Sequence, residues 1–502
     1  MTNVVPAVGI GGENLESLNH GEFDLSVVDR KYSPIEEVFR ISAKPEHDGT
    51  LDDSSVAVFI AADPKKVTRL WSMKMGGRVR LEKNTGGNTW VAVGDTECKN
   101  HKIGVINNFL HAMFCRVEIT LGDSVRIADS GTRPYVYKSF FEQFLNCSRT
   151  YQRDVLSHHG YIPDKIGASD QTDATLDSEG QADVAQLNQD AGDPAQVAPA
   201  EKIVGEYKNP GWWARRKDLV TGDYFEFYMP IYHDLLKARK CLPPGVEMKI
   251  NFYFNTETFP IWCGLPKTEA ASVKYRLAFE KDSFYVDYER FLVKKEITRA
   301  YQRALASHKY LAIPIVRTLV KTYRVTKATG QDIGHRNWIP RSAHLPSQVI
   351  VCFVAADAYD GAITGNPFKL EHLDFRSASL IINSESEPAQ SYDTAKPSAH
   401  HPRAKAFFWK MMREIGHVTE TQFETALTPD GFFDSQFFLC FDRSPSKDNS
   451  FVGALYDSGS LGLKLELRKE LQFENGLQVI ALMSYSSNVC IYNDTVRIEY
   501  FD

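Results

Sequence analysis

The chain has 502 residues, of which 43% are hydrophobic and 12% are aromatic, so two or three domains with large cores are expected. The net charge of −6 and the pI near 6.2 argue against a dedicated nucleic-acid-binding protein, which would usually carry a basic patch or tail. No apolar run approaches the about 20 residues that a membrane-spanning helix requires.

The N-terminal residues and the cysteines both indicate a protein made in a reducing compartment. Residues 1–16 contain no charged region followed by a long apolar region, so no secretory signal is predicted. The eight cysteines include no CxxC pair, and several lie in or beside apolar strand-like runs: Cys115, Cys352, Cys440 and Cys490. We therefore expect free thiols and no disulfide framework.

The first 100 residues begin with a weakly patterned segment and continue with strands. Residues 1–50 are rich in Gly, Pro and charge, and are expected to form an N-terminal arm or a disordered tail. Residues 55–60 form the first predicted strand, and residues 76–93 form two short strands around a Gly-Gly-Asn turn. Lys65 and Lys66 form a short basic cluster that is expected to be solvated, with weak contact to nucleic acid as the alternative.

Residues 103–147 contain helix, strand, turn, strand and helix in that order, which is unusual for a β-rich chain. Apolar residues at 109, 110, 113 and 114 predict one or two helical turns. Val117, Ile119 and Leu121 then alternate with polar residues, which predicts a strand with one apolar face. After a turn at 132–134, a second helix carries its apolar face on Tyr137, Phe140, Phe141, Phe144 and Leu145.

An acidic segment follows at about 169–200. It contains no basic residue and no aromatic residue, and its carboxylates are Asp170, Asp173, Asp177, Glu179, Asp183, Asp190 and Asp193. Such a composition buries too little apolar surface to offset the entropy lost on ordering. We expect a mobile, solvated surface insertion, with a loop that binds a partner or becomes ordered on assembly as the alternative.

Strands return after the acidic segment and lead into a helix. Residues 224–229 and 275–293 are strand-like, and residues 246–254 alternate strictly between apolar and other side chains. Residues 296–307 then form a predicted helix, with Ile297 and Tyr301 on its apolar face. This helix is a natural connector between two halves of the chain.

The order of elements before this helix is repeated after it, although few residues are identical. The predicted matches are 55–60 with 316–325, 107–121 with 375–383, 137–145 with 407–415, 224–229 with 437–441, 246–254 with 461–468, and 275–293 with 477–500. Each half consists of short antiparallel strands with two small helices, which is typical of a jelly-roll sandwich.

The predicted fold is therefore all-β, with two tandem jelly-roll β-sandwiches and small inserted helices. We predict an arm at 1–50, a first jelly roll at 51–295 with the acidic insertion at about 169–200, a connector helix at 296–311, and a second jelly roll at 312–502.

Motifs for catalysis or cofactor binding are missing from the sequence. It contains no GxxxxGK[ST], HExxH, GxSxG or EF-hand pattern, and the Gly-rich residues 9–12 neither follow a strand nor open a helix. The pairs His158-His159 and His400-His401 are expected to be solvated, because neighbours in a strand point to opposite faces. We therefore predict no catalytic, cofactor-binding or metal-binding residue, and no enzyme activity.

One cluster joins two tryptophans to three basic residues. For Trp212 and Trp213 we expect packing in a core or a subunit interface, with ligand stacking as the alternative. For Arg215, Arg216 and Lys217 we expect a solvated surface, with weak contact to nucleic acid as the alternative.

Several stretches resemble one protein family when they are taken in order. The run VINNFLHAMFCRVEITLGDSVRI is followed by RPYVYKSFFEQFLNC, and the likeness continues through YHDLLKARKCLPPGVEMKINFYFN, FYVDYERFLV and VIVCFVAADAYDGAITGNPFKLEHLDFRSASLIIN. These stretches resemble the major capsid proteins of Polinton (Maverick) elements and adintoviruses and, more distantly, those of virophages. Arg133-Pro134-Tyr135 stands where that family has a Tyr-Pro-Tyr-like motif before an aromatic helix. The resemblance covers nearly all of 55–502 and departs from the family pattern at the acidic segment.

The resemblance implies a structural protein of the virion. Such a protein forms homotrimers that present six jelly rolls as a pseudo-hexagonal capsomer, and the capsomers tile an icosahedral shell around a DNA genome. Its implied partners are further copies of itself, a single jelly-roll penton protein at the vertices and, at most weakly, the packaged DNA, with no membrane span. The alternative that the residues leave open is a jelly-roll carbohydrate-binding protein or glycoside hydrolase with an aromatic-lined cleft and paired carboxylates.

Overall fold

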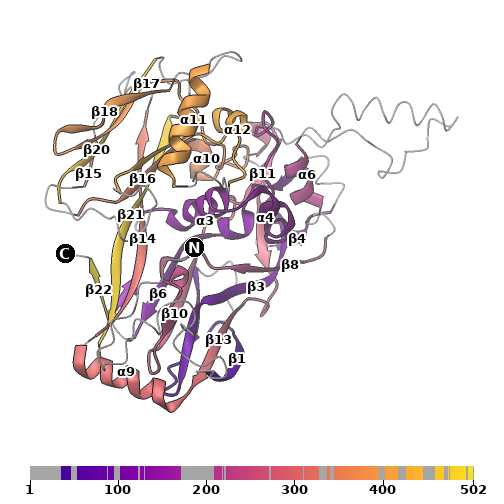
Figure 1. Cartoon of the computed structure of the whole chain (residues 1–502). Coiled ribbons are helices and arrows are strands. Elements are labelled where there is room, and N and C mark those ends of the chain that lie inside the picture. Colours follow the sequence, from indigo (N-terminus) through magenta and orange to yellow (C-terminus); the bar gives the residue numbers. More distant parts are fainter. Residues whose placement is uncertain are drawn as a thin grey trace.

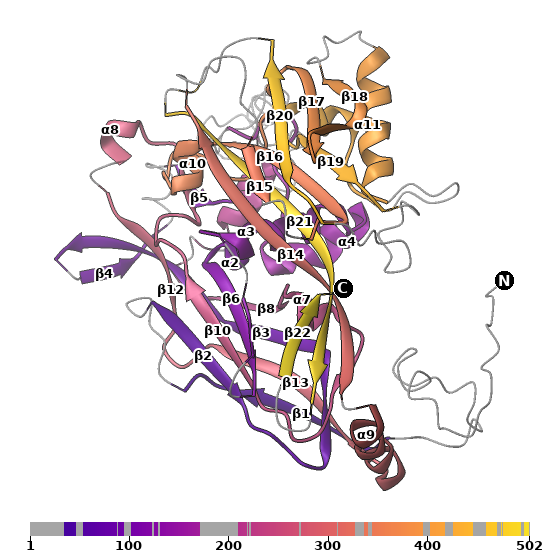
Figure 2. The ribbon, with the colours of Figure 1, turned by 90° about the vertical axis from the view of Figure 1, so that its left-hand side faces the viewer.

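The computed structural model describes residues 35–46, 54–87, 89–94, 102–122, 125–128, 131–170, 209–217, 219, 222–270, 273–308, 310–326, 336–339, 344–394, 402–416, 425–444, 458–468, 473, 475–492 and 496–500. Residues 1–34 of the predicted arm and 171–200 of the acidic segment lie outside this part. Figures 1 and 2 show two β-sandwiches, the first (indigo to pink) below the second (orange to yellow), with short helices between them.

The first sandwich contains one larger and one smaller antiparallel sheet. The larger sheet joins β1 (Ile35–Ala43), β13 (Tyr285–Val293) and β3 (Lys66–Gly86), and β3 also pairs with β4 (Thr89–Ala92), β8 (Phe225–Pro230), β9 (Cys241–Leu242) and β12 (Tyr275–Phe279). The smaller sheet has the order β2 (Ser55–Ile60), β10 (Met248–Phe254), β6 (Phe114–Leu121) and β7 (Val125–Ile127). A separate pair joins β5 (Ile103–Val105) to β11 (Ile261–Cys263).

The second sandwich has the same construction. One sheet has the order β14 (Leu311–Val325), β21 (Leu477–Ile491), β16 (Gln348–Ala355) and β19 (Phe438–Asp442), with β22 (Val496–Tyr500) on β21. The other has the order β15 (Arg336–Ile339), β20 (Leu461–Leu467), β17 (Phe375–Ile382) and β18 (Glu385–Thr394). In β20 the four alternating leucines are buried while Lys464 is exposed, as the period of two in its sequence predicts.

Strand order shows that one plan is used twice. In the first half the main strands are β1, β2, β3, β6, β7, β8, β10 and β13, and in the second they are β14 to β21. Both halves place the first, eighth, third and sixth of these strands in one sheet, and the second, seventh, fourth and fifth in the other. This is a double jelly roll, which confirms the predicted fold class.

One of the predicted matches between the halves is wrong. The sequence pairs the first strand after the connector with residues 55–60, yet β14 takes the sheet position of β1, because each lies beside the last main strand of its own half. The strand that corresponds to β2 is the short β15. The error arises because β1 is exposed along much of its length, so its sequence lacks a clear apolar alternation.

Two predicted elements differ from the structure in the first half. Residues 35–43, inside the predicted arm, form β1 and pair with β13 over eight residue pairs, so this part belongs to the sheet. The predicted short strands at 76–93 are the end of the 21-residue β3, which begins at Lys66, and β4. Charged residues interrupt the start of β3, and they are accommodated by ion pairs such as Arg69 with Glu289 at 2.8 Å.

The helices lie mainly where the two sandwiches meet. They are α2 (Phe109–Ala112), α3 (Pro134–Leu145), α4 (Arg149–Asp154), a 3-10 turn (Leu156–His159), α6 (Pro210–Lys217), α7 (Asp234–Lys237), α8 (Lys267–Ala270), α9 (Lys295–His308), α10 (Ala356–Asp360), α11 (Pro402–Glu414) and α12 (Pro429–Asp434). The helix predicted at 296–307 is confirmed as α9, which stands apart at the lower end of the molecule before β14 (Figure 2).

Buried apolar side chains of both sandwiches form one continuous cluster, and a smaller one lies under α9. Chain length alone suggests separate cores, but the aromatic residues of α3 pack into both halves and join them. Within the described residues, no helix combines the length and the apolar character needed to cross a bilayer.

Candidate functional site at the junction of the jelly rolls

The aromatic helix α3 is the centre of the junction (Figure 1). Proline occupies its first position, where the missing N–H costs no helical hydrogen bond, and every residue except Glu142 is buried. From this helix, Phe140 stacks on Phe368 of the second jelly roll with ring centroids 4.4 Å apart, and Tyr137 stacks on Tyr359 at 5.9 Å. The sequence predicts one apolar face for this helix, whereas the structure covers it on nearly all sides.

A buried ion pair adds a polar connection at the same place. Lys138 Nζ lies 2.6 Å from Asp234 Oδ2, and each side chain is 1% exposed. The same oxygen accepts the backbone N–H of Thr318 in β14 at 2.9 Å. Burial alone would raise the pKa of Asp234, but the charge of Lys138 and then that of Lys237 hold it below the usual value. The ionised carboxylate therefore joins α3, α7 and the first strand of the second jelly roll.

Arg133, which the sequence marks in an Arg-Pro-Tyr motif, reaches the second jelly roll directly. Its Nη1 donates to the Tyr359 carbonyl at 2.7 Å, and its Nε donates to Asn255 Oδ1 at 2.8 Å. The guanidinium also lies 4.8 Å from the Phe259 ring centroid. In the same motif, the Tyr135 hydroxyl lies 3.0 Å from Nδ1 of buried His111. The motif therefore holds α3 to both halves.

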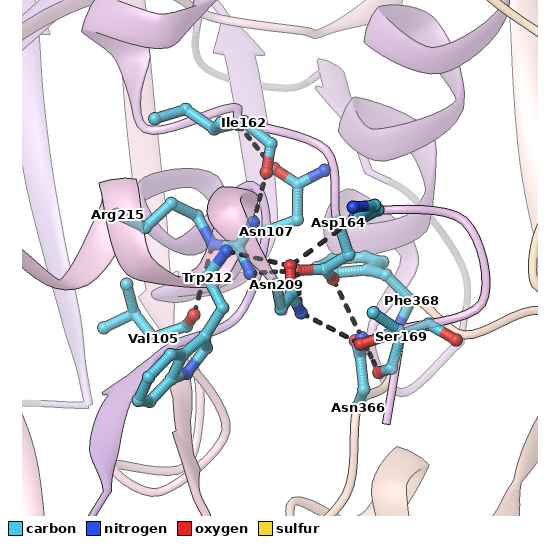
Figure 3. Close-up of polar contacts among 12 residues, drawn as sticks. Val105, Asn107, Ile162, Asp164, Ser169, Asn209, Trp212, Arg215, Asn366 and Phe368 are labelled. Atoms are coloured by element: carbon cyan, nitrogen blue, oxygen red, sulfur yellow. Dashed lines mark hydrogen bonds and ion pairs between the residues drawn. The ribbon is translucent and has the colours of Figure 1, made fainter. Parts of the chain in front are cut away.

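A second polar cluster surrounds Asn209, just before α6 (Figure 3). Asn209 Nδ2 donates to Asp164 Oδ1 at 3.1 Å and to the Ala168 carbonyl at 3.0 Å. Arg215 Nη2 donates to the same Asp164 oxygen at 2.6 Å. From the second jelly roll, Asn366 Nδ2 donates to Asp164 Oδ2 at 3.1 Å and to the carbonyl of Ser169 at 3.0 Å. Asp164 thus connects three segments that are far apart in sequence.

Most of the basic cluster after the tryptophans is buried, so the prediction of a solvated surface there is wrong. Arg215 and Arg216 are 2% and 0% exposed, and they donate to the carbonyls of Val105 at 3.2 Å and Ile103 at 3.1 Å. This leaves neither guanidinium available to DNA. The prediction of core packing is confirmed for Trp212, which is 0% exposed. The spacing of apolar residues gives no signal for buried arginines that bind strand-end carbonyls.

The remaining candidate residues lie apart from the junction. Lys65 is exposed, whereas Lys66 is half-buried, 3.6 Å from Asp63 and 3.8 Å from the Phe39 ring centroid. His158 is exposed, and burial lowers the pKa of half-buried His159 to about 4. The pair His400-His401 lies outside the described residues.

The described part of the chain contains free thiols and no group of potential metal ligands. There, Cys115, Cys147, Cys241, Cys263, Cys352, Cys440 and Cys490 are free thiols. Within these same ranges, no three His, Cys, Asp or Glu side chains are grouped so that they could hold a metal ion.

Comparison with known proteins gives similarity in structure without detectable similarity in sequence. No family model and no curated protein sequence matches the chain. A chain of the Sputnik virophage structure matches with a TM-score of 0.54 and 9% identity, over 100% of this chain and 95% of that one.

Two further solved structures match at a TM-score of 0.50. They are VP54 of PBCV-1, with 11% identity over 95% of this chain and 99% of that one, and the Faustovirus major capsid protein, with 8% identity over 95% and 92%. At these identities the likeness establishes the fold. The chain has the double jelly-roll fold of these viral major capsid proteins over essentially its whole length.

Proposed function

We propose that the chain is a major capsid protein that assembles as homotrimeric, pseudo-hexagonal capsomers, which tile an icosahedral shell around a DNA genome. The observation that carries this proposal is the duplicated strand order over a fold shared with the Faustovirus major capsid protein. Because a likeness of fold does not by itself establish function, the proposal needs the assembly test given below.

The junction supports this role physically. Stacked rings, a buried ion pair and one continuous core fix the two jelly rolls against each other, so the chain acts as one building block. Three such blocks around an axis make heterologous contacts that close at three and present six jelly rolls. Strands rise about 3.3 Å per residue, so the 15 residues of β14 span about 50 Å, which is useful height for a shell wall.

The proposed location is the virion, with the chain made and assembled inside the host cell. The proposed partners are further copies of the chain and a single jelly-roll penton protein at the vertices. Contact with packaged DNA is proposed to be weak at most, because the net charge is −6 and Arg215 and Arg216 are buried. The division into an arm at 1–50, jelly rolls at 51–295 and 312–502, and a connector at 296–311 is kept as part of this proposal, except that residues 35–43 form β1 and belong to the first jelly roll. A relationship to Polinton and adintovirus proteins is also part of the proposal.

We propose a structural role without enzymatic activity. The described residues give no specific support to the alternative of a carbohydrate-binding protein or a glycoside hydrolase. In the groove beside α4 and α6, the carboxylate among the lining residues is Asp164, which binds Arg215. A glycoside hydrolase would need two carboxylates facing each other across such a groove.

Light scattering coupled to size exclusion tests the assembly, with negative-stain images of the same fractions. A trimer should have a mass near 170 kDa, three times the 56.7 kDa of one chain, or the sample should contain shells. A monomer that persists across protein concentration and salt would contradict the proposal, and glycan binding would then be measured.

A further inference from the structure

The connector helix α9 has an apolar face and a basic face. Ile297 is 7% exposed and Tyr301 is half-buried, and both pack in the small apolar cluster at this end of the first jelly roll. Lys295, Arg299 and Arg303 follow one another at intervals of four residues, and all three are exposed. A step of two residues turns a helix by about 200°, so the basic stripe lies opposite the apolar one and faces away from the sheet.

The stability of the helix does not explain this stripe. Like charges four residues apart repel each other, and a base in the first turn, such as Lys295, is also disfavoured by the helix dipole. Against its three lysine and arginine residues, the helix carries one acid, Glu296. In the described part of the chain, neither Lys295 nor Arg299 pairs with a carboxylate, so both charges are available to a partner.

The turn between β2 and β3 brings one further base to this end. In the antiparallel pair of β3 and β13, Lys66 lies opposite Leu292. Extending this register by one residue places Lys65 beside Val293, two residues before the start of α9. Lys65 is exposed and forms no ion pair with the described residues, whereas Lys66 pairs with Asp63 at 3.6 Å. Available bases from two segments therefore share the lower end of the molecule, where α9 stands apart from the other helices (Figure 2).

The chemistry of this surface favours a polymer of phosphates. Duplex DNA carries about one negative charge per 1.7 Å of its axis, so several neighbouring bases can each meet a phosphate. A helix that lies in a membrane surface inserts an exposed apolar face between the lipids. The apolar face of α9 is covered by the sheet, with Ile297 buried, and the face it exposes is basic. The surface therefore fits a nucleic acid better than a lipid layer.

We propose that the exposed face of α9, together with Lys65, binds the phosphate backbone of duplex DNA without reading its sequence. This inference rests on the proposed function for the source of the DNA, which is the packaged genome, and it assigns the weak contact to one end of the chain. Contacts to phosphates position a protein on a duplex but carry no sequence information. A threefold rotation keeps equivalent residues at one height along its axis, so a trimer presents three copies of the surface together and weak contacts add.

Fluorescence anisotropy of a labelled duplex with the full-length chain tests this assignment. Each phosphate contact contributes about 0.9 to the fall of log affinity with log salt concentration, so contacts from Lys65, Lys295 and Arg299 give a slope of about −2.7. We expect the affinity to fall at least about 40-fold between about 50 and 200 mM salt. A duplex of unrelated sequence should bind equally well.

Two matched double substitutions separate this surface from a general effect of charge. Lys295→Gln with Arg299→Gln removes two contacts, so the slope should become shallower by about 1.8 and the affinity at the lower salt concentration should fall about tenfold or more. Lys410→Gln with Arg413→Gln makes the same change of charge at exposed positions of α11, at the opposite end of the molecule (Figure 2). This control should leave the slope and the affinity unchanged.

Several outcomes would overturn the proposal. Equal losses in the two variants would do so, and so would an absence of binding to the duplex at the lower salt concentration. Sedimentation of the chain with phosphatidylserine vesicles, lost in the α9 variant while the duplex is not bound, would assign the surface to a membrane instead.

The solution mass distinguishes a failure of this proposal from a failure of the proposed function. A monomer that binds the duplex through α9 would support the surface and contradict the capsomer. A trimer that does not bind the duplex would support the capsomer and contradict the surface.

Discussion

At the scale of single residues, the structure buries charged groups that the sequence places on a polar face. Glu118 lies in the strand predicted to alternate, on its polar side, yet it is 0% exposed. Arg116 and Arg126 form ion pairs with its carboxylate, and the Tyr253 hydroxyl donates to it at 3.0 Å. Arg116 of the same strand, together with Arg126 of β7 and Tyr253 of β10, thus replaces water around the carboxylate. Sequence periodicity cannot reveal the two partners on neighbouring strands.

The ion pair of Lys138 with Asp234 gives the first prediction. Lys138→Met removes the charge but keeps the length of the side chain, so it leaves the carboxylate buried without its main partner. We expect a loss of about 3–5 kcal/mol in the free energy of unfolding, measured by denaturant titration. The control is Lys237→Met, at a side chain that is 34% exposed, which should cost about 1 kcal/mol or less. Equal losses in the two variants would contradict the assigned role.

Buried His111 gives a prediction about pH. Burial lowers the pKa of this 0% exposed imidazole from 6.5 to about 3, with a smaller effect from His159. The folded state keeps the imidazole neutral, whereas the unfolded state protonates it. The contribution of His111 to the free energy of unfolding is therefore fully present above about pH 6.5 and decreases as the pH drops from there towards 3. The slope for one such proton is about 1.4 kcal/mol per pH unit.

The measurement is the free energy of unfolding of the wild type and of His111→Gln between pH 7.5 and 4.5. We expect the two curves to converge as the pH falls, because glutamine does not titrate. A constant difference between them would contradict the assignment. Asp234 does not mimic this effect, because its pKa is below the usual value and its contribution is lost at lower pH.

At the scale of elements, the sequence identifies α3, the short helix α2 beside it and most core strands, but not α6. Strict alternation predicts β10 and β20, and an apolar stripe predicts α3 and α11. In contrast, α6 is predicted only as a cluster of tryptophans and basic residues. Its position depends on the Val105 carbonyl of β5 and on the Asp164 carboxylate of the 161–164 loop, which lie more than 40 residues earlier in the chain.

The fit of α6 against that loop can be tested at Gly211. A methyl group at this position would overlap the backbone carbonyl oxygen of Pro163, so Gly211→Ala must move the helix or the loop. We expect a destabilisation of about 1–3 kcal/mol, together with faster proteolysis near 161–170. The control is Gly94→Ala, where nothing lies within 4 Å of the added carbon. Equal stability of the two variants would show that α6 is not tightly packed there.

At the scale of the whole molecule, the repeat of eight strands explains both the architecture and the proposed assembly. Each half could bury its own sheets, yet Phe140, Tyr137 and Arg133 extend the core and its polar contacts from the first half into the second. The two jelly rolls therefore keep a fixed relation, and a trimer of such chains presents six comparable units. The light-scattering mass described under the proposed function decides whether the chain forms this trimer.

The sequence by itself determined the β-rich class, the duplication of elements, the helix α3 and the absence of catalytic motifs. These properties follow from the hydrophobic period and the composition of stretches of a few residues. Tertiary structure alone decided that β14 corresponds to β1, that Arg215 and Arg216 are buried, and that Lys138 pairs with Asp234. These outcomes depend on partners about 50 to 250 residues away in sequence. A buried charge is stable only where the fold brings such partners into contact with it, and no local sequence pattern shows which distant residues will be in contact.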